Sequence, residues 1–170
     1  RYYPGDSARF ENLFDVFTVK VVQGNPKTAL SDPFSVMLSE DNAKKYFGAE
    51  DPMNKTLRYN NQFDLKVTGV YKSFPANAHI HPEMMVSFST LNDSLVYGAE
   101  NMRTNWGNNS FFTYLLLPEH YDIKNMESRF PAFIDSRMAG QEYVGKQASK
   151  FTKLGLQKLT DIHLYSHTDY

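Results

Sequence analysis

The stretch SVMLSEDNAKKYFGAEDPMNKTL, residues 35–57, determines much of the fold. Its first residues predict a buried strand, because a short apolar run bounded by turn signals is typical of one. Ser39 can then cap a helix, since its side-chain oxygen accepts an orphan backbone N–H. A turn at Asp51-Pro52 and a strand from Lys55 follow. The block is predicted as strand, helix, turn and strand, and it contains no evident nucleophile, metal cluster or phosphate loop.

The helix predicted over residues 39–47 is short. Ala43, Tyr46 and Phe47 recur at i, i+3 and i+4, so they should form one apolar face. Gly48 suits the left-handed position just after the helix. Because a helix of about two turns does not persist alone, it must pack on the neighbouring strands.

Residues 55–72 predict a β-hairpin, since apolar and polar residues alternate with the period of a strand. The expected apolar face of its second strand holds Phe63, Leu65, Val67, Gly69 and Tyr71. A three-residue loop at 60–62 would pair Tyr59 with Phe63 and keep the apolar faces of the two strands in step. A two-residue loop would not, so we predict the longer loop or a bulge nearby.

Upstream of this block, Phe10, Phe14 and Phe17 form a dense aromatic patch. We interpret the patch as a core anchor beneath the sheet, with an exposed binding surface as the alternative. A strand is expected at 18–22. Downstream of the hairpin, the segment MMVSFSTL at 84–91 predicts another strand.

The second half of the chain predicts a strand, a helix and a strand. A short helix at 90–97 ending at Gly98 and a polar connector precede this part. An apolar strand at 111–117 is followed by a helix at 122–138, which Pro131 should kink or divide. A final strand is expected at 154–159. This order is the pattern of a βαβ unit.

Composition excludes several classes of protein. The chain has 170 residues, 41% of them apolar and 22% charged, which is globular rather than disordered. The net charge of −1 gives no basic excess for nucleic acid or anionic lipid. Cysteine is absent, so disulfides and zinc thiolate sites are excluded. The first residue is Arg1 and not Met, so we expect this to be a piece of a longer protein.

Two motifs could carry binding chemistry. GNPKTAL at 24–30 is similar to a phosphate loop, but the second glycine is missing and Pro26 removes a backbone donor. HIHPE offers His79, His81 and Glu83, which could bind zinc or iron. Because a proline interrupts HIHPE and the segment leads into a strand, we interpret its histidines as loop or surface residues.

The candidate catalytic residues do not form a recognisable catalytic motif either. Asp161, His163, Ser166 and His167 could be drawn as a hydrolase triad, yet no Gly-x-Ser-x-Gly elbow exists. Glu50-Asp51 falls in a predicted turn and should be solvated or capping. We therefore predict no catalytic, cofactor-binding or metal-binding residues, and no enzyme.

The blocks at 10–30, 35–57 and 63–75 together resemble the MacB-like periplasmic core domain of FtsX-like ABC transporter permeases, in a variant common in Bacteroidetes-type permeases. The residues that match this pattern are Ala43, Lys44, Phe47, Gly48, Asp51, Pro52, Lys55, Thr56, Val67, Gly69 and Val70. One departure is Asn54, where the family usually has glycine before Lys55; the turn there is expected to be less tight. VSFSTL, NWGNNSFFTYLLLPE and LTDIHLYS extend the resemblance to nearly the whole chain.

The resemblance implies an α+β fold of two lobes, a mixed α/β lobe with a β-hairpin inserted into a porter-like βαβ lobe. By analogy, residues 1–93 are the inserted lobe, 94–108 the connector and 109–170 a porter half. The first porter strand and helix would lie upstream of Arg1, which would leave an edge of the porter sheet uncovered.

The resemblance also implies a function. The chain would be the periplasmic domain of an inner-membrane permease, without catalytic residues, which relays ATP-driven motion for export or mechanotransmission. Its partners would be a cytoplasmic ABC ATPase subunit or domain, a second permease in a dimer, and a periplasmic adaptor or cargo protein, but not nucleic acid. The alternative is a module that binds a lipid, lipoprotein or peptide cargo. A third hypothesis is a metallohydrolase that uses the histidines.

Overall fold

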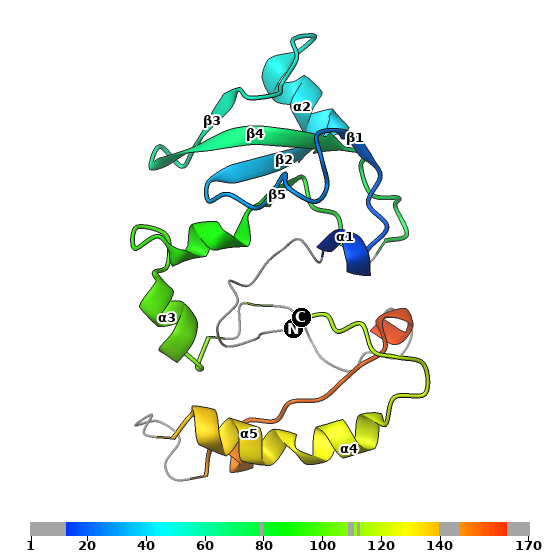
Figure 1. Cartoon of the computed structure of the whole chain (residues 1–170), viewed down its shortest axis with the longest axis vertical. Coiled ribbons are helices and arrows are strands. Elements are labelled where there is room, and N and C mark those ends of the chain that lie inside the picture. Colours follow the sequence, from blue (N-terminus) through cyan, green and yellow to red (C-terminus); the bar gives the residue numbers. More distant parts are fainter. Residues whose placement is uncertain (1–12, 79, 109–110, 112, 140–146, 163–170) are drawn as a thin grey trace. The chain divides into compact units, whose positions relative to one another are not determined.

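The computed structural model describes residues 13–78, 80–108, 111, 113–139 and 147–162. The chain divides into two compact units, Arg1–Thr104 and Asn105–Tyr170, and each is described by itself (Figure 1). No helix in the described residues is long and apolar enough to cross a membrane.

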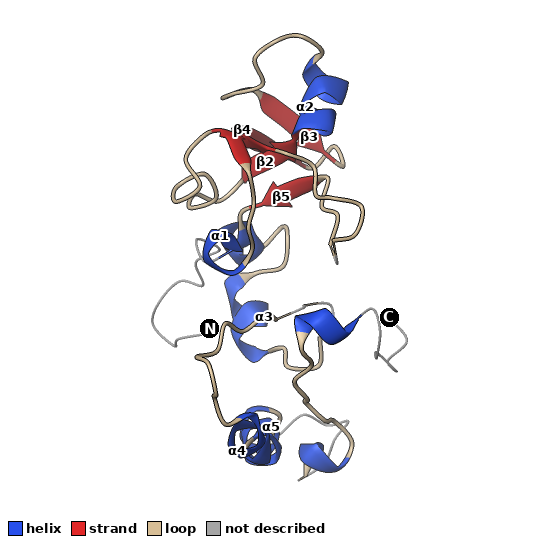
Figure 2. Ribbon diagram, turned by 90° about the vertical axis from the view of Figure 1, so that its right-hand side faces the viewer, coloured by secondary structure: helices blue, strands red, loops and turns tan. Residues whose placement is uncertain are grey.

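A mixed sheet organises the first unit. Its five strands are β1 (Val21–Gln23), β2 (Ser35–Ser39), β3 (Thr56–Tyr59), β4 (Phe63–Tyr71) and β5 (Met84–Val86). The order is β1-β4-β2-β5, and β3 pairs with β4 as well. The long strand β4 runs parallel to β2 and antiparallel to β1 and β3. Figure 2 shows β2, β3, β4 and β5 together in this sheet. The sheet is therefore built around β4.

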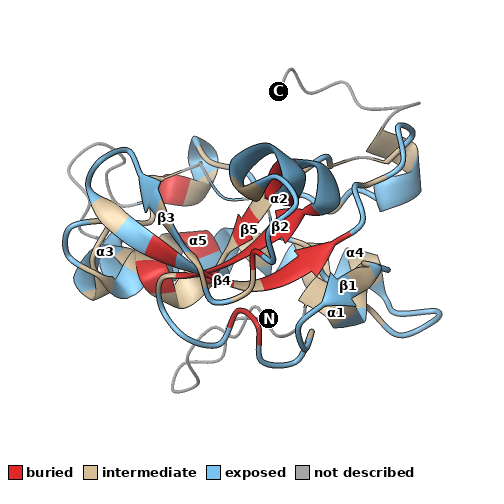
Figure 3. Ribbon diagram, turned by 90° about the horizontal axis from the view of Figure 1, so that it is seen from above, coloured by how far each residue is buried: buried red, intermediate tan, exposed pale blue. Residues whose placement is uncertain are grey.

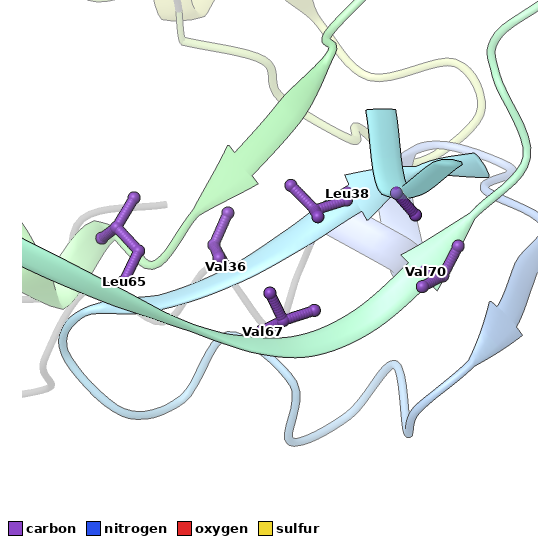
Figure 4. Packing of buried hydrophobic residues seen from close by; sticks show 6 residues of the cluster. Val36, Leu38, Leu65, Val67 and Val70 are labelled. Atoms are coloured by element: carbon purple, nitrogen blue, oxygen red, sulfur yellow. The ribbon is translucent and has the colours of Figure 1, made fainter. Parts of the chain in front are cut away.

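Both faces of the sheet are covered. Helix α2 (Glu40–Phe47) lies on one face, above a cluster of buried side chains (Figure 4). The cluster consists of Val36, Leu38, Ala43, Leu65, Val67 and Val70. The opposite face carries a second cluster, Ala29, Leu30, Met37, Tyr71 and Met85. Strand β2 is buried along its whole length between the two (Figure 3).

A β-bulge at Thr68 divides β4 into two halves, and the alternation of side chains between the two faces of the sheet is reversed after it. The pairing with β2 passes from Val36–Val67 to Met37–Gly69, so one residue of β4 has no partner. The Thr68 hydroxyl donates a hydrogen bond to the Ala29 carbonyl at 2.6 Å. The predicted strict alternation is therefore wrong beyond Val67.

The bulge moves two side chains relative to the sequence prediction. Val70, expected on the polar face, is buried with Leu65 in the first cluster. Tyr71 is buried with Met37 on the other face. Because side chains alternate across a strand, one extra residue exchanges the faces of everything after it.

The predicted helix cap is confirmed. The Ser39 side chain accepts the Asn42 N–H at 3.3 Å. Gly48 has φ 64° and ψ −122°, and the Glu50 N–H donates to the Phe47 carbonyl at 3.1 Å. This is the first central position of a type II′ turn, which requires positive φ. The positive φ of the predicted left-handed conformation is confirmed, but the ψ of −122° differs from the left-handed helical value, because Gly48 begins a type II′ turn.

The buried face of α2 differs from the prediction at one residue. Ala43 is buried and Phe47 packs on the first cluster, as expected. Tyr46 is 45% exposed instead. Asn42 takes a buried place, because its amide is hydrogen-bonded to the start of β5 and so carries no unpaired polar group into the interior.

The three-residue hairpin loop is confirmed. Tyr59 pairs with Phe63, and Arg58 lies opposite Asp64 with an ion pair of 3.0 Å. The loop residues Asn60 and Asn61 have φ of 48° and 56°. Asparagine tolerates this left-handed conformation better than most residues.

Asn54 also adopts a left-handed φ, at 62°. Its N–H donates to the Val67 carbonyl at 2.8 Å. The turn therefore has the backbone conformation that a glycine would favour, and asparagine replaces that glycine without loosening the hydrogen bond.

Several element boundaries were predicted wrongly in the first unit. Helix α1 (Leu13–Val16) precedes β1, which occupies only part of the expected strand. Strand β5 ends at Val86 and is followed by the 3₁₀-helix η2 (Phe88–Asn92). Gly98, with φ 93°, precedes helix α3 (Ala99–Thr104) instead of ending a helix.

Helices dominate the second unit. Asp122 caps α4 (Ile123–Ser128) by accepting the Asn125 N–H at 3.0 Å. Pro131 lies in the first turn of α5 (Phe130–Arg137), so the predicted division into two helices is confirmed. Short 3₁₀-helices η3 (Ala148–Lys150) and η4 (Leu159–Asp161) follow.

The strands predicted in the second unit are wrong for the described residues. Residues 111 and 113–117, and residues 154–158, form no ladder. An apolar run predicts burial but cannot supply a pairing partner. The Leu156 N–H instead donates to the Glu127 carboxylate at 2.9 Å, so a side chain of α4 satisfies it. The βαβ pattern is not formed by this part of the chain.

Candidate functional site

A polar cluster joins the end of β4 to the start of β5, where HIHPE lies. The Tyr71 hydroxyl donates to the Pro82 carbonyl at 2.8 Å. The Asn42 amide donates to the Glu83 carbonyl at 2.9 Å and approaches its carboxylate at 3.4 Å. The Ser39 N–H donates to the same carbonyl at 3.1 Å. The cluster thus fastens this segment to α2 and β4.

The electrostatics of the cluster keep Tyr71 neutral. Its side chain has no solvent exposure. Burial raises the pKa of Tyr71 well above its ordinary value, and the negative charge of Glu83 raises it further. The neutral phenol of Tyr71 can therefore donate its hydrogen bond to the Pro82 carbonyl, and this bond holds the loop that follows β4.

The proposed metal ligands are not brought together by the described residues. His81 is exposed, Glu83 is engaged with Asn42, and His79 lies outside the described residues. In the described part of the chain, no group of three or more His, Cys, Asp or Glu residues could hold a metal ion. The role of His79 stays a prediction.

The GNPKTAL segment forms a turn that covers the second face of the sheet. The Asn25 carbonyl accepts the Thr28 and Ala29 N–H groups at 3.1 and 2.8 Å. Ala29 and Leu30 are buried against Met37 and Tyr71. The residues that resembled a phosphate loop therefore contribute core packing.

The other acidic candidate of the first unit also supports a turn. The Lys55 ammonium hydrogen-bonds to Glu50 and lowers the pKa of that carboxyl. Asp51 accepts the Met53 N–H at 3.1 Å. The interpretation of Glu50-Asp51 as a capped and solvated turn is confirmed.

The remaining candidates are only partly described. Asp161 ends η4, and its carboxylate accepts the Thr160 hydroxyl at 3.1 Å. His163, Ser166 and His167 lie outside the described residues, so the triad is untested. Phe14 packs on the second core cluster, which confirms the core-anchor interpretation for that residue, while Phe10 is outside the described residues.

Sequence reasoning missed an aromatic and cationic cluster in the second unit. Trp106 meets Phe133 edge to face, with ring centroids 5.5 Å apart. The Arg137 guanidinium lies 5.5 Å from the Trp106 ring. Trp106 also packs on the small core of Ile134, Met138 and Ala148. The spacing of Phe133 and Arg137, four residues apart on a predicted helix, was the available signal.

The second unit also exposes many large apolar side chains. Those exposed among its described residues are Phe111, Leu115, Leu116, Tyr121, Phe133, Phe151, Leu154 and Leu159. Leu116 is 74% and Phe151 79% exposed. Leu116 lies in the predicted strand 111–117, whereas Phe151 precedes the predicted strand 154–159.

A comparison with known protein families assigns the chain to a family. The sequence model of the MacB-like periplasmic core domain matches residues 5–132. The chain belongs to this family. The family assignment confirms the resemblance on residues 35–57, and it places the mixed sheet of the first unit in a periplasmic domain.

Among the similar solved structures, one shares the fold over most of this chain. A domain of a permease protein from Porphyromonas gingivalis is 20% identical over 92% of this chain and 67% of that chain, with a TM-score of 0.61. The periplasmic region of MacB from Actinobacillus actinomycetemcomitans is 26% identical over 52% of this chain and 39% of that chain, with a TM-score of 0.39. A search of the curated proteins found no match.

A third structure is the extracellular domain of the noncanonic ABC-type transporter YknZ from Gram-positive bacteria. It is 28% identical over 48% of this chain and 42% of that chain, with a TM-score of 0.37. The chain thus spans less than half of the MacB and YknZ domains. As a MacB-like periplasmic core domain, it is a periplasmic part of an ABC transporter permease, and its family consists of transporter domains and not of enzymes.

Proposed function

We propose that this domain transmits the ATP-driven motion of its permease to a protein in the periplasm. The proposal rests on one observation, the dense packing of the first unit around β2. A strand buried on both faces, β2, is clamped between β4 and β5. A displacement applied at one side of such a packed body reaches the other side, because cores of native density deform little.

The polar contacts add to this stiffness. Tyr71, Asn42 and Ser39 fasten the loop after β4 to the rest of the sheet. Ser73 donates to the Asp41 carboxylate at 2.5 Å, which ties the same loop to α2. The segments that leave the sheet are thus held at several points, as a body that transmits force requires.

The proposed partners follow from the family. A cytoplasmic ABC ATPase subunit or domain would supply the motion, and a periplasmic adaptor or cargo protein would receive that motion. A second permease would form the dimer. The inserted position of the mixed lobe within a porter lobe is part of the same proposal.

Locking the lobes tests the proposal in the full permease. Once any cysteines elsewhere in the permease have been replaced, cysteine pairs can be introduced, one residue in 35–72 and one in 123–137, because this domain itself contains no cysteine that would compete. The pairs are then screened for oxidation. An oxidised pair should stop transport while ATP binding survives, and reduction should restore transport. The matched control is a pair within α2 and β4. Transport by a fully locked permease would contradict the proposal.

A second candidate function is favoured by the exposed apolar side chains of the second unit. Leu116 and Phe151 would contact a lipid, lipoprotein or peptide cargo, because both are large apolar side chains that are largely exposed to solvent. Exchanging each for Ser in the full permease should abolish cargo binding if this function holds. The same exchange at exposed Leu95 of the first unit is the control.

A further inference from the structure

We propose that the joint between the two units is the single residue Asn105. This inference rests on the proposed function, whose test assumes that the two units move relative to one another. It assigns that motion to one residue instead of to the whole polar connector. It is carried by what holds the chain on each side of that residue.

On the first side, η2 is fastened to the sheet. The Thr90 hydroxyl, which is buried, accepts the Phe34 N–H at 2.8 Å. The Ser87 N–H donates to the Ser35 carbonyl at 2.9 Å. The 3₁₀-helix is therefore tied to β2 and to the residue before it.

Helix α3 is fastened in turn to η2. The Gly98 N–H donates to the carbonyls of Leu91 and Asp93, both at 2.9 Å. The Met102 N–H donates to the Gly98 carbonyl, and the Thr104 hydroxyl donates to the Glu100 carbonyl at 2.9 Å. The contacts that hold the first unit together therefore continue to Thr104.

On the other side, Trp106 belongs to the second unit. Its ring packs on Phe133 and on the core of Ile134 and Met138, with Arg137 over its face. A large aromatic side chain packed in this way restricts its own backbone. The second unit is therefore anchored at Trp106, directly after Asn105.

Only Asn105 is left between the two fastenings. It is exposed, belongs to no helix or strand, and its side chain makes no hydrogen bond in the described part of the chain. A hinge needs only a few residues whose φ and ψ are free to change. Asn105 meets that condition, whereas the loop at 93–98 is closed by the hydrogen bonds of Asp93 and Gly98.

Distances between spin labels test the position of the hinge. In the cysteine-free chain, labels at Lys44 and Glu100 span the sheet and α3, labels at Glu100 and Lys124 span Asn105, and labels at Lys124 and Ser136 stay within the second unit. The distance distribution of the Glu100–Lys124 pair should be about twice as broad as the other two. A Lys44–Glu100 distribution equally broad would overturn the proposal, because it would place the joint at 93–98.

Two substitutions at one position sharpen the test. Asn105→Pro should narrow the Glu100–Lys124 distribution, because proline fixes φ at residue 105. Proline also disfavours the helical conformation of Thr104, so an unchanged Lys44–Glu100 distribution is the required control that α3 is kept. Asn105→Gly should broaden it. Neither should change the Lys124–Ser136 pair, which reports folding of the second unit. If neither substitution changes the Glu100–Lys124 distribution, the hinge is not at Asn105.

This measurement is independent of transport. If the distances respond as expected but the full permease carrying Asn105→Pro transports normally, the hinge stands and the proposed motion-transmitting function fails. If the distances do not respond, the hinge fails whatever transport does.

Discussion

Gly69 of β4 lies opposite Met37 of β2, and a Cβ placed on Gly69 would lie only 2.6 Å from the Met37 Cε. The same atom would lie 3.1 Å from the Gln23 carbonyl oxygen of β1. Gly24, with φ 90°, is tighter still, because its Cβ would lie 2.4 Å from the Thr68 carbonyl oxygen. Two glycines thus let β1 approach β4 beside the bulge.

Gly69→Ala should destabilise the chain by about 1–3 kcal/mol, because the added methyl overpacks a filled site. Combining it with Met37→Ala should cost less than the sum of the two single changes, since the cavity left at Met37 accommodates the methyl. Urea denaturation of the four proteins measures this coupling. Strict additivity would show that the two residues do not share the space.

Gly24→Ala should cost more than Gly69→Ala, because the group it meets is a backbone carbonyl that cannot rotate away, and because its φ is positive. Gly155→Ala is the matched control, since no atom lies within 4 Å of the added Cβ and its φ is ordinary. Urea midpoints rank the three changes. An equal effect at Gly24 and Gly155 would contradict the close approach of β1 and β4.

Gly48→Ala should cost about 1–3 kcal/mol through backbone strain alone, because its φ of 64° and ψ of −122° are disfavoured for a residue with a Cβ. No atom lies within 4 Å of that Cβ, so crowding contributes nothing. Ala49→Gly, next in the turn, is the control. A Gly48→Ala protein as stable as the original would refute the type II′ turn.

Tyr71→Phe should cost about 1–3 kcal/mol, because it leaves the Pro82 carbonyl without its donor. Tyr59→Phe is the control, since that side chain is 42% exposed and its ring stacking on Phe63 is retained. Thermal melting of the two variants at neutral pH measures the difference. Equal melting temperatures would show that the hydroxyl of Tyr71 contributes nothing.

Alkaline pH should expose the same group. Burial raises the pKa of Tyr71 above 10.0, so above that pH the folded chain keeps a proton that the unfolded chain has released. Stability is therefore fully present below pH 10.0 and falls as the pH rises further. The fall should be smaller in Tyr71→Phe, as urea denaturation on either side of pH 10.0 would measure.

Replacing both His79 and His81 with Ala should leave the melting temperature nearly unchanged, because His81 is exposed and surface substitutions change stability little. A chelator should have no effect either. Asn42→Gln, at the residue that holds Glu83 from the other side, is the contrasting variant and should lower the melting temperature. A large drop with either the histidine change or the chelator would indicate a metal site.

Local patterns predicted the 35–72 block well. The cap at Ser39, the positive φ of Gly48 and the Tyr59–Phe63 pairing each depend on residues within a few positions of one another, so their physics is readable from sequence. The bulge at Thr68 is different. It depends on the Ala29 carbonyl, 39 positions away, and no local pattern reports that contact.

In the second unit, local sequence patterns predicted strands that did not form in the described residues. The apolar runs at 111–117 and 154–159 have the composition of strands, but a strand exists only when another strand pairs with it. Among the candidate site residues, the described part of HIHPE, residues 80–83, forms a loop that leads into β5, as predicted. That its glutamate and proline carbonyls are held by Asn42 and Tyr71 required the fold.

The placement of Trp106 has a spectroscopic consequence. It is the single tryptophan of the chain, and it packs within the second unit beside Arg137. Its emission therefore reports its packing against Phe133 and Arg137 in the second unit, while circular dichroism reports the strands, which in the described residues all belong to the first unit. One unlabelled sample can show whether the two units melt together or in sequence.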